Sequence, residues 1–374
     1  MKDTFAIVYA GHGNPFLGDL IAHRCVSALP LAGRFRTIDV MLSNLSQSRV
    51  RNVGVIMQRN FQSLVEHIGS GDAWDLSSKS GGVALLTPFD QGMGTDLYQG
   101  FGDALFAKRY YINRQRAKYC LLLASDMVYR EDYSRLLEHH LETGADITLL
   151  YSRDLRLGLG DPTYVANLHV SDDGWVTGVD FGPRGEDEGC YNLGACIMEK
   201  ELLIQLVEDA CSEGRYHFVT DILGPATGTH KVAALEHKGY ASRLTTVKSY
   251  FDITRDMLDP EVRGELFYDN GPVYTRVADA PPVRYSAGCE VENSVFGNGC
   301  VVRGRVAGSV VFRGVSIESD ADVENCVIMQ DSRIGKGAYL RNAIIDKDVV
   351  VSDGARVVGT PDSQAVVRKG LIVR

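Results

Sequence analysis

The sequence predicts two domains: a Rossmann-like, three-layer α/β/α domain with a mostly parallel sheet, followed by a left-handed parallel β-helix of hexapeptide repeats. Short apolar runs alternate with amphipathic segments up to about residue 256, and aliphatic residues then recur every five or six positions. At 374 residues the chain is also too long for one ordinary core. We therefore expect an α/β domain over 1–256, a linker over 257–284 and a β-helix over 285–374.

Composition narrows the class of protein. The chain is 45% hydrophobic and 23% charged, which is typical of a globular protein. Its net charge of −9 argues against nucleic-acid or anionic-membrane partners. The eight cysteines form no C-x-x-C pair, and the first apolar run is too short for a signal peptide. These features favour a cytoplasmic protein with no membrane partner.

The first predicted strand, Phe5–Tyr9, runs into Ala10-Gly11-His12-Gly13-Asn14-Pro15. Glycines in such a loop let backbone N–H groups approach an anion, so Gly11 and Gly13 are candidate nucleotide-binding positions. Chemistry at phosphorus also needs cations, and no Lys or Arg occurs between Gly11 and Leu20. The pattern predicts a phosphate loop that lacks its charge.

Strands and helices then alternate along the α/β domain. Val53–Met57 and Tyr119–Ala124 are predicted buried strands, and each precedes an amphipathic helix. We expect Asn60 to cap the first helix, and we expect the second to run from Asp132 to Gly144. Short connections between such elements are typical of a parallel sheet covered by helices.

Asp126 stands just past the end of the strand Tyr119–Ala124. Ligands of open α/β sheets bind at the carboxyl ends of strands, so Asp126 is a candidate metal ligand and catalytic group. The alternative is that Ser125-Asp126 only caps the turn.

The hexapeptide signal follows a proline-bearing connector that includes Pro272 and Pro281-Pro282. One aliphatic side chain per step is expected to point into a triangular core, and stacked coils are expected to supply the stability. Domains of this kind commonly assemble into oligomers. The predicted core positions are Val295, Val301, Val306, Val311, Ile317, Val323, Ile328, Ile334, Leu340, Ile345, Val351 and Val357.

Several motifs resemble one family of nucleotidyltransferases. The strongest is His67-Ile68-Gly69-Ser70-Gly71-Asp72-Ala73-Trp74-Asp75-Leu76, and Gly33–Asp39 and Ser125–Tyr129 add to it. Together they resemble the ADP-glucose pyrophosphorylase (glucose-1-phosphate adenylyltransferase) family of glycogen synthesis. In an active member, the resemblance implies, glucose-1-phosphate attacks the α-phosphorus of ATP while Mg²⁺, Arg and Lys neutralise charge.

The sequence departs from that family at the positions that handle phosphate. By the resemblance, Phe16 replaces an arginine, Val26 a lysine, and Arg243 an aspartate that binds metal. A sugar-binding Glu-Lys-Pro has become Phe181-Gly182-Pro183, and a segment near the nucleotide survives only as Gly100-Phe101-Gly102-Asp103-Ala104. Gly100 and Asp103 are therefore remnant nucleotide-binding positions, and we expect no metal site.

This combination resembles the GlgD-type regulatory subunit. The resemblance implies a homo- or hetero-oligomer with a catalytic subunit, Mg²⁺ only in that partner, and no cofactor in this chain. It also implies a nucleotide or sugar-phosphate effector, with Asp126 as a remnant.

Three other interpretations remain open. Nearby Arg24, Arg34 and Arg36 could restore the charges of an active, divergent adenylyltransferase. The pocket could instead serve as a metabolite sensor without turnover. A β-helix acetyltransferase would need a histidine base, and no His follows His237.

Overall fold

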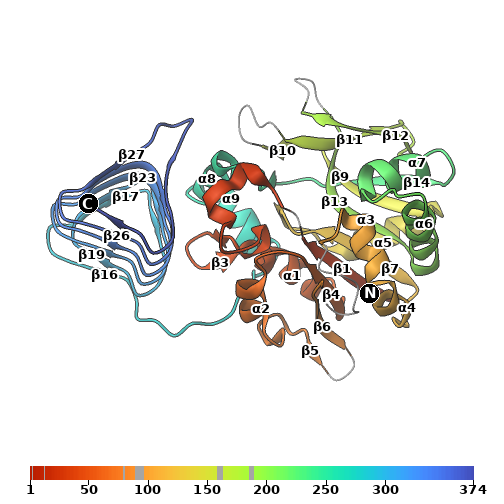
Figure 1. Cartoon of the computed structure of the whole chain (residues 1–374), viewed down its shortest axis with the longest axis horizontal. Helices are drawn as coiled ribbons and strands as arrows, with labels where there is room; N and C mark the ends of the chain where they lie inside the picture. Colours follow the sequence, from red (N-terminus) through yellow and green to blue (C-terminus); the bar gives the residue numbers. More distant parts are fainter. Residues whose placement is uncertain (2, 12, 79–80, 89–96, 158–162, 185–188) are drawn as a thin grey trace.

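A computed structural model describes residues 1, 3–11, 13–78, 81–88, 97–157, 163–184 and 189–374. It contains an α/β domain and a parallel β-helix that lie side by side (Figure 1), which confirms the predicted fold class. Among the described residues, no helix is long and apolar enough to cross a membrane.

The α/β domain is built on a mixed sheet with ten strands among the described residues. Strand β1 pairs in parallel with β4 on one side and with β7 on the other, so Ala6 lies between Val53 and Leu121. Strand β13 is antiparallel to β7, and the β11–β12 hairpin closes that edge. The strands used below are β1 (Thr4–Ala10), β4 (Asn52–Met57), β6 (Gly81–Leu86), β7 (Tyr119–Ala124), β11 (Tyr164–Val170), β12 (Val176–Pro183) and β13 (Tyr191–Glu199).

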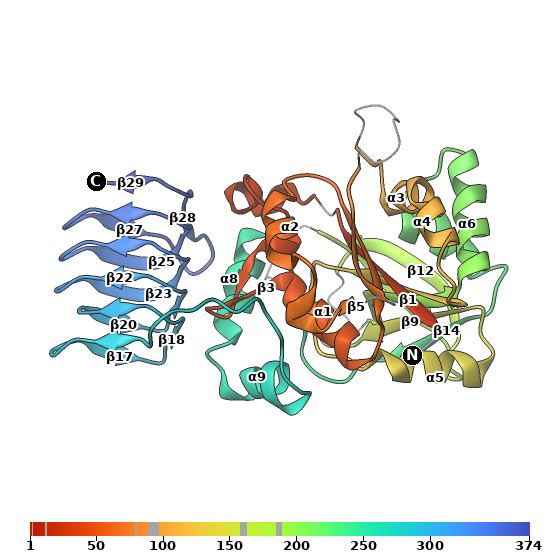
Figure 2. The same ribbon diagram turned by 90° about the horizontal axis from the view of Figure 1, so that it is seen from below.

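Helices cover both faces of this sheet (Figure 2). Because side chains alternate along a strand, Ala6 and Val8 of β1 pack against α1, α2 and α5, whereas Phe5 and Ile7 pack against α3, α4 and α6. Two apolar cores therefore sandwich the sheet. The helices are α1 (Thr37–Gln47), α2 (Gln62–Ile68), α3 (Phe101–Ala107), α4 (Arg109–Asn113), α5 (Tyr133–Thr143) and α6 (Lys200–Ser212).

The two predicted helix starts had different outcomes. Asp132 caps α5 by accepting a hydrogen bond from the Ser134 N–H at 3.0 Å, and the helix ends at Gly144, whose φ is +62°. The predicted Asn60 cap is wrong. Asn60 adopts a φ of +50°, and its side-chain amide donates to the Ile21 carbonyl. Helix α2 therefore begins only at Gln62.

The segment predicted as a linker contains two helical turns, α9 (Pro260–Gly264) and η5 (Glu265–Asp269). Leu266 and Phe267 are buried there against the α/β domain. No helix or strand occupies the stretch 271–283, which leads into the β-helix. The Trp74 indole donates to the Tyr274 carbonyl at 3.0 Å, so the stretch most typical of the family anchors this connection.

The β-helix stacks short parallel strands into coils (Figure 2). Val306, Val323, Leu340 and Val357 lie in register on successive coils, as the repeat predicts. The first coils depart from the prediction, because Val302 is fully buried and Val301 only half-buried. The strands of one face are β16 (Arg284–Tyr285), β19 (Val301–Val302), β22 (Ser316–Ile317), β24 (Arg333–Ile334), β26 (Val350–Val351) and β29 (Ile372–Val373).

A third apolar core joins the two domains. Val26 and Leu29 of the α/β domain pack in one cluster with Phe312 and Met329 of the β-helix. Arg24 reaches into this interface and binds Asp346 at 2.7 Å, with only 5% and 2% of the two side chains exposed. The two domains therefore share a continuous, mostly apolar contact.

Candidate functional site

The candidate site lies where the order of the sheet reverses. From β1 the chain passes to β4 and β6 on one side and returns to β7 on the other. Gly11 follows β1 and Asp126 follows β7, and the Ser125 hydroxyl donates to the Tyr9 carbonyl at 2.7 Å. Open α/β sheets bind ligands in the crevice at such a switch point, so the structure brings Gly11 and Asp126 to the expected edge.

Asp126 is held by Arg243. The Arg243 Nε donates to Asp126 Oδ2 at 2.9 Å, and the two side chains are 22% and 5% exposed. The pairing of β8 (Met127–Tyr129) with the antiparallel β15 (Ala241–Arg243) brings them together, since Arg243 lies opposite Met127. The Leu244 N–H also donates to the Asp126 carbonyl at 2.8 Å. Two distant residues thus form one mostly buried ion pair.

A divalent metal does not fit this arrangement. Among the residues that the structure describes, no three His, Cys, Asp or Glu side chains converge in a way that could hold a metal ion. The Arg243 guanidinium occupies one oxygen of Asp126, and its positive charge repels a cation at that place. The side chains present therefore do not suit Mg²⁺.

The residues that follow Gly13 form a short helix and include no Lys or Arg up to Leu20. Asn14 accepts a hydrogen bond from the Phe16 N–H at 3.1 Å and starts the 3-10 helix η1 (Pro15–Ile21). Phe16, where the family resemblance implies an arginine, is 51% exposed. The Tyr9 ring packs over Gly11, where a Cβ would collide with it, whereas a Cβ on Gly13 would meet nothing within 4 Å.

Gly100 and Asp103 have structural roles at the start of α3. A Cβ on Gly100 would collide with the Tyr216 carbonyl oxygen, and the Gly102 N–H donates to that same oxygen at 2.8 Å. The Asp103 carboxylate accepts a hydrogen bond from the Gln99 N–H at 2.9 Å. These contacts explain why the positions retain glycine and aspartate whether or not a nucleotide binds.

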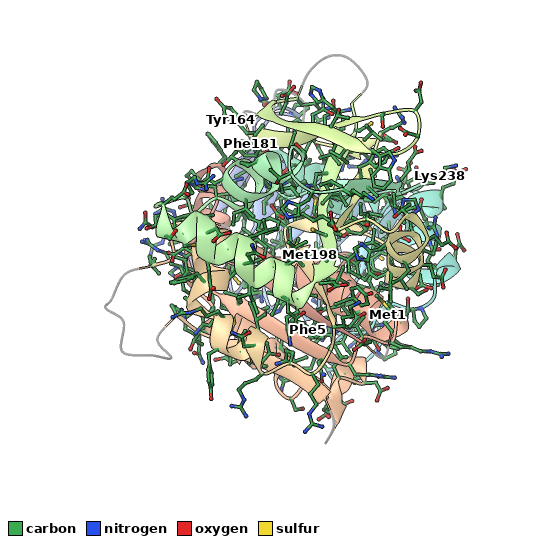
Figure 3. The ribbon with its side chains drawn as sticks, turned by 90° about the vertical axis from the view of Figure 1, so that its right-hand side faces the viewer. Met1, Phe5, Tyr164, Phe181, Met198 and Lys238 are labelled. Atoms are coloured by element: carbon green, nitrogen blue, oxygen red, sulfur yellow. The ribbon has the colours of Figure 1, made fainter. Side chains whose placement is uncertain are left out.

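An exposed aromatic pair lies beside the ion pair. Tyr164 of β11 and Phe181 of β12 are diagonal neighbours across the hairpin, and their ring centroids lie 5.6 Å apart (Figure 3). Of the two residues, 54% and 46% are exposed. Arg243 Nη1 donates to the Tyr164 carbonyl at 3.0 Å. Phe181, in the stretch where the resemblance implies Glu-Lys-Pro, and Tyr164 therefore form an exposed aromatic contact on this hairpin.

The three nearby arginines contact other groups in the structure. Arg24 is engaged with Asp346 across the domain interface. Arg36 Nη1 donates to the Ser63 carbonyl at 2.5 Å, and the Arg34 guanidinium lies 5.2 Å from the centroid of the Phe35 ring. All three side chains are directed to other partners.

A cationic cluster of Arg24, Arg36 and Lys347 lies at the domain interface, and the sequence does not predict it. Burial and the positive charges of Arg36 and Arg24 lower the pKa of Lys347 to about 8. No sequence signal could reveal this cluster, because Arg24 and its partner Asp346 are separated by 322 residues.

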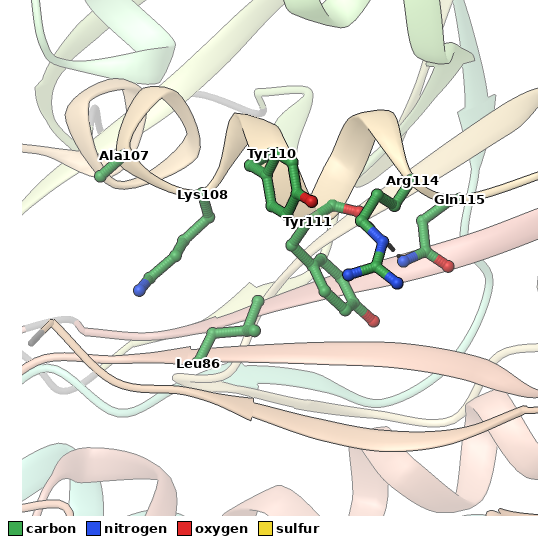
Figure 4. A pocket seen from close by; sticks show the side chains of 7 residues that line it. All are labelled: Leu86, Ala107, Lys108, Tyr110, Tyr111, Arg114 and Gln115. Atoms are coloured by element: carbon green, nitrogen blue, oxygen red, sulfur yellow. Dashed lines mark hydrogen bonds between the residues drawn. The ribbon is translucent and has the colours of Figure 1, made fainter. Parts of the chain in front are cut away.

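A separate cavity of about 510 Å³ lies between the end of β6 and the helices α3 and α4 (Figure 4). The Tyr111 ring enters it over Gly54 of β4, and the Lys108 ammonium donates to the Thr87 carbonyl at 2.6 Å. None of the candidate site residues lines this cavity. The lining residues are Leu86, Ala107, Lys108, Tyr110, Tyr111, Arg114 and Gln115.

Comparison with known proteins agrees with this architecture. Residues 17–259 match the model of the family described as nucleotidyl transferase, and residues 283–369 match a GlmU-like C-terminal hexapeptide domain.

Similarity also extends over nearly the whole chain. Glucose-1-phosphate adenylyltransferases of Bacillus cereus (strain ATCC 10987 / NRS 248), Bacillus mycoides (strain KBAB4) and Bacillus anthracis are each 29% identical to it over 352 residues. The alignments cover 93% of this chain and 93% of each relative. Because the first match alone covers more than half of its residues, this chain belongs to the nucleotidyl transferase family.

Proposed function

We propose that this chain is a regulatory, catalytically weak or inactive subunit of a glucose-1-phosphate adenylyltransferase in glycogen synthesis. The reaction of such an assembly converts ATP and glucose-1-phosphate into ADP-glucose and pyrophosphate. The similarity to the Bacillus enzymes supports the pathway. The Asp126–Arg243 ion pair is the observation that supports the regulatory role.

The ion pair matters because phosphoryl chemistry depends on cations placed in advance. Removal of one such stabilising group typically costs about 10²- to 10³-fold in rate. At this site the carboxylate is engaged by Arg243, Phe16 offers no charge to a phosphate, and Val26 is buried in the core. Several losses in one site predict a very slow reaction, so the chain would need no cofactor, and Mg²⁺ would serve its catalytic partner.

The partner in this proposal is a catalytic glucose-1-phosphate adenylyltransferase subunit. The test compares ADP-glucose synthesis by the purified chain, by the catalytic relative of the same organism, and by the two mixed. We expect no turnover from the chain alone and an altered rate or effector response in the mixture. Robust turnover by the chain alone would overturn the proposal.

A matched variant separates regulation from chemistry. Asp126→Asn in this chain should leave ADP-glucose synthesis by the purified chain alone at background, because Asp126 is not expected to act on substrate there. An active, divergent adenylyltransferase would instead lose its contribution to the rate. The comparison also tests the alternative of an enzyme that relies on Asp126 alone.

A sensor role is the second candidate, and it is compatible with the first. It is favoured by Arg243, whose side chain is 22% exposed where it binds Asp126 at the end of β7. The ligand would be a nucleotide or sugar-phosphate effector that the chain binds without turnover.

A further inference from the structure

We infer that Arg243 is a built-in cation, through which this chain binds a phosphate-bearing ligand at the carboxyl edge of β1 and β7 without a divalent metal. The inference rests on the proposed regulatory function and specifies what its remnant site binds. It starts from the mismatch between the site and Mg²⁺.

The first step concerns charge. Asp126 carries one negative charge, and the Arg243 guanidinium beside it carries one positive charge. The pair is neutral as a whole, as a divalent ion between two carboxylates would be. The positive member faces outward, because Arg243 is 22% exposed and Asp126 only 5%. Of the two charged groups, the guanidinium is therefore the one more accessible to an anion.

The second step counts hydrogen-bond donors. A guanidinium has five N–H groups in a planar fork. Arg243 uses Nε on Asp126 and one Nη1 hydrogen on the Tyr164 carbonyl. The other three N–H groups have no hydrogen-bond acceptor within the described portion of the chain. Two N–H groups of a fork match two oxygens of a phosphate, which gives this ligand class its specificity.

The third step concerns how the fork is held. Asp126 fixes one edge of the guanidinium, and the Tyr164 carbonyl fixes another, so little side-chain freedom remains to be lost on binding. Tyr164 also belongs to the exposed aromatic pair with Phe181. A sugar or a base attached to the phosphate would find a surface there.

Calorimetry of the purified full chain tests the inference, with glucose-1-phosphate, ATP and ADP-glucose each titrated in EDTA and in Mg²⁺. Glucose-1-phosphate is the main probe, because Mg²⁺ changes the charge of ATP itself. We expect at least one of the three to bind, with glucose-1-phosphate or ADP-glucose equally tight in both buffers. The three arms distinguish a sugar phosphate from a nucleotide.

Three variants sharpen the test. Arg243→Ala should weaken binding by at least about tenfold, the usual loss for hydrogen bonds to a charged group. Arg243→Asp should bind weakly in EDTA and recover in Mg²⁺, since two carboxylates would then face each other. Arg116→Ala, an exposed arginine in the α4–β7 connection, is the matched control and should bind as the wild type does.

Asp126→Asn is a second variant that tests the inference even if Arg243→Ala fails to fold. It keeps the guanidinium and removes its neutralising partner, so binding in EDTA should be retained or tightened. Loss of binding in this variant, or wild-type binding that requires Mg²⁺, would overturn the inference. No heat with any probe would also overturn it, whereas the rate of the mixed subunits would still test the regulatory proposal separately.

Discussion

At the scale of single residues, the candidate site combines glycines that packing requires with a glycine that borders open space. Gly100 is packed against the Tyr216 carbonyl, and Gly11 lies under the Tyr9 ring. Gly13 borders open space. Packing therefore requires glycine at Gly11 and Gly100 but not at Gly13.

Alanine substitutions should separate these roles. Gly100→Ala is expected to destabilise the chain by about 1–3 kcal/mol, because the new methyl group overpacks against a backbone oxygen. Gly13→Ala should change the free energy of unfolding by less than about 1 kcal/mol, since its Cβ has room. Urea denaturation followed by circular dichroism measures both. Equal effects at the two positions would contradict this assignment.

At the scale of elements, the hexapeptide spacing predicts the period of the β-helix correctly, but it names the wrong buried residue in one of the first coils. The spacing of aliphatic residues places Ile317, Val323 and Ile328 in the core, and all three are fully buried. In the coil where β19 lies, both candidate positions are valine, so spacing alone cannot decide which one points inward. The structure buries Val302.

An aspartate scan of this strand tests the register. Val302→Asp should cost at least about 3 kcal/mol, because it places an unpaired charge in a dry core. Val301→Asp should cost about 1 kcal/mol or less, since that side chain is only half-buried. Thermal denaturation of the two variants gives the comparison. A larger loss from Val301→Asp would mean that the register is reversed.

At the scale of the whole molecule, the two domains are joined by an apolar core and a buried ion pair. Arg24→Ala should cost about 3–5 kcal/mol, because Asp346 would remain buried without its partner. Arg368→Ala removes the exposed pair between Arg368 and Asp19, and it should cost about 0–1 kcal/mol. Limited proteolysis within 271–283, together with urea denaturation, should show the loosened interface only in Arg24→Ala. Equal protection of both variants would contradict the importance of the buried pair.

The cationic cluster at the same interface predicts a pH dependence. The pKa of Lys347 is lowered to about 8 by burial and by Arg36 and Arg24, whereas the unfolded chain titrates near the ordinary value of about 10.5. Between these values the unfolded state binds more protons, so this group makes stability rise as pH increases from 8 towards 10.5. Below pH 8 both states are protonated, and the contribution is constant.

Lys347→Met supplies the comparison for that prediction. The variant should be more stable than the wild type at pH 7 by about 1–3 kcal/mol, and the difference should shrink as pH rises through 8 to 10. Urea denaturation at each pH measures the difference. A constant difference, or one that grows with pH, would show that Lys347 does not titrate in this window.

The sequence by itself determined the fold class, because hydrophobic periodicity is a local property that strands, helices and coils each repeat many times. It also determined which residues stand at the carboxyl ends of β1 and β7. Tertiary structure alone decided that Arg243 binds Asp126, 117 residues away, and that Arg24 binds Asp346. Such pairs depend on sheet order and domain packing, since charge complementarity between distant residues leaves no periodic trace along the chain.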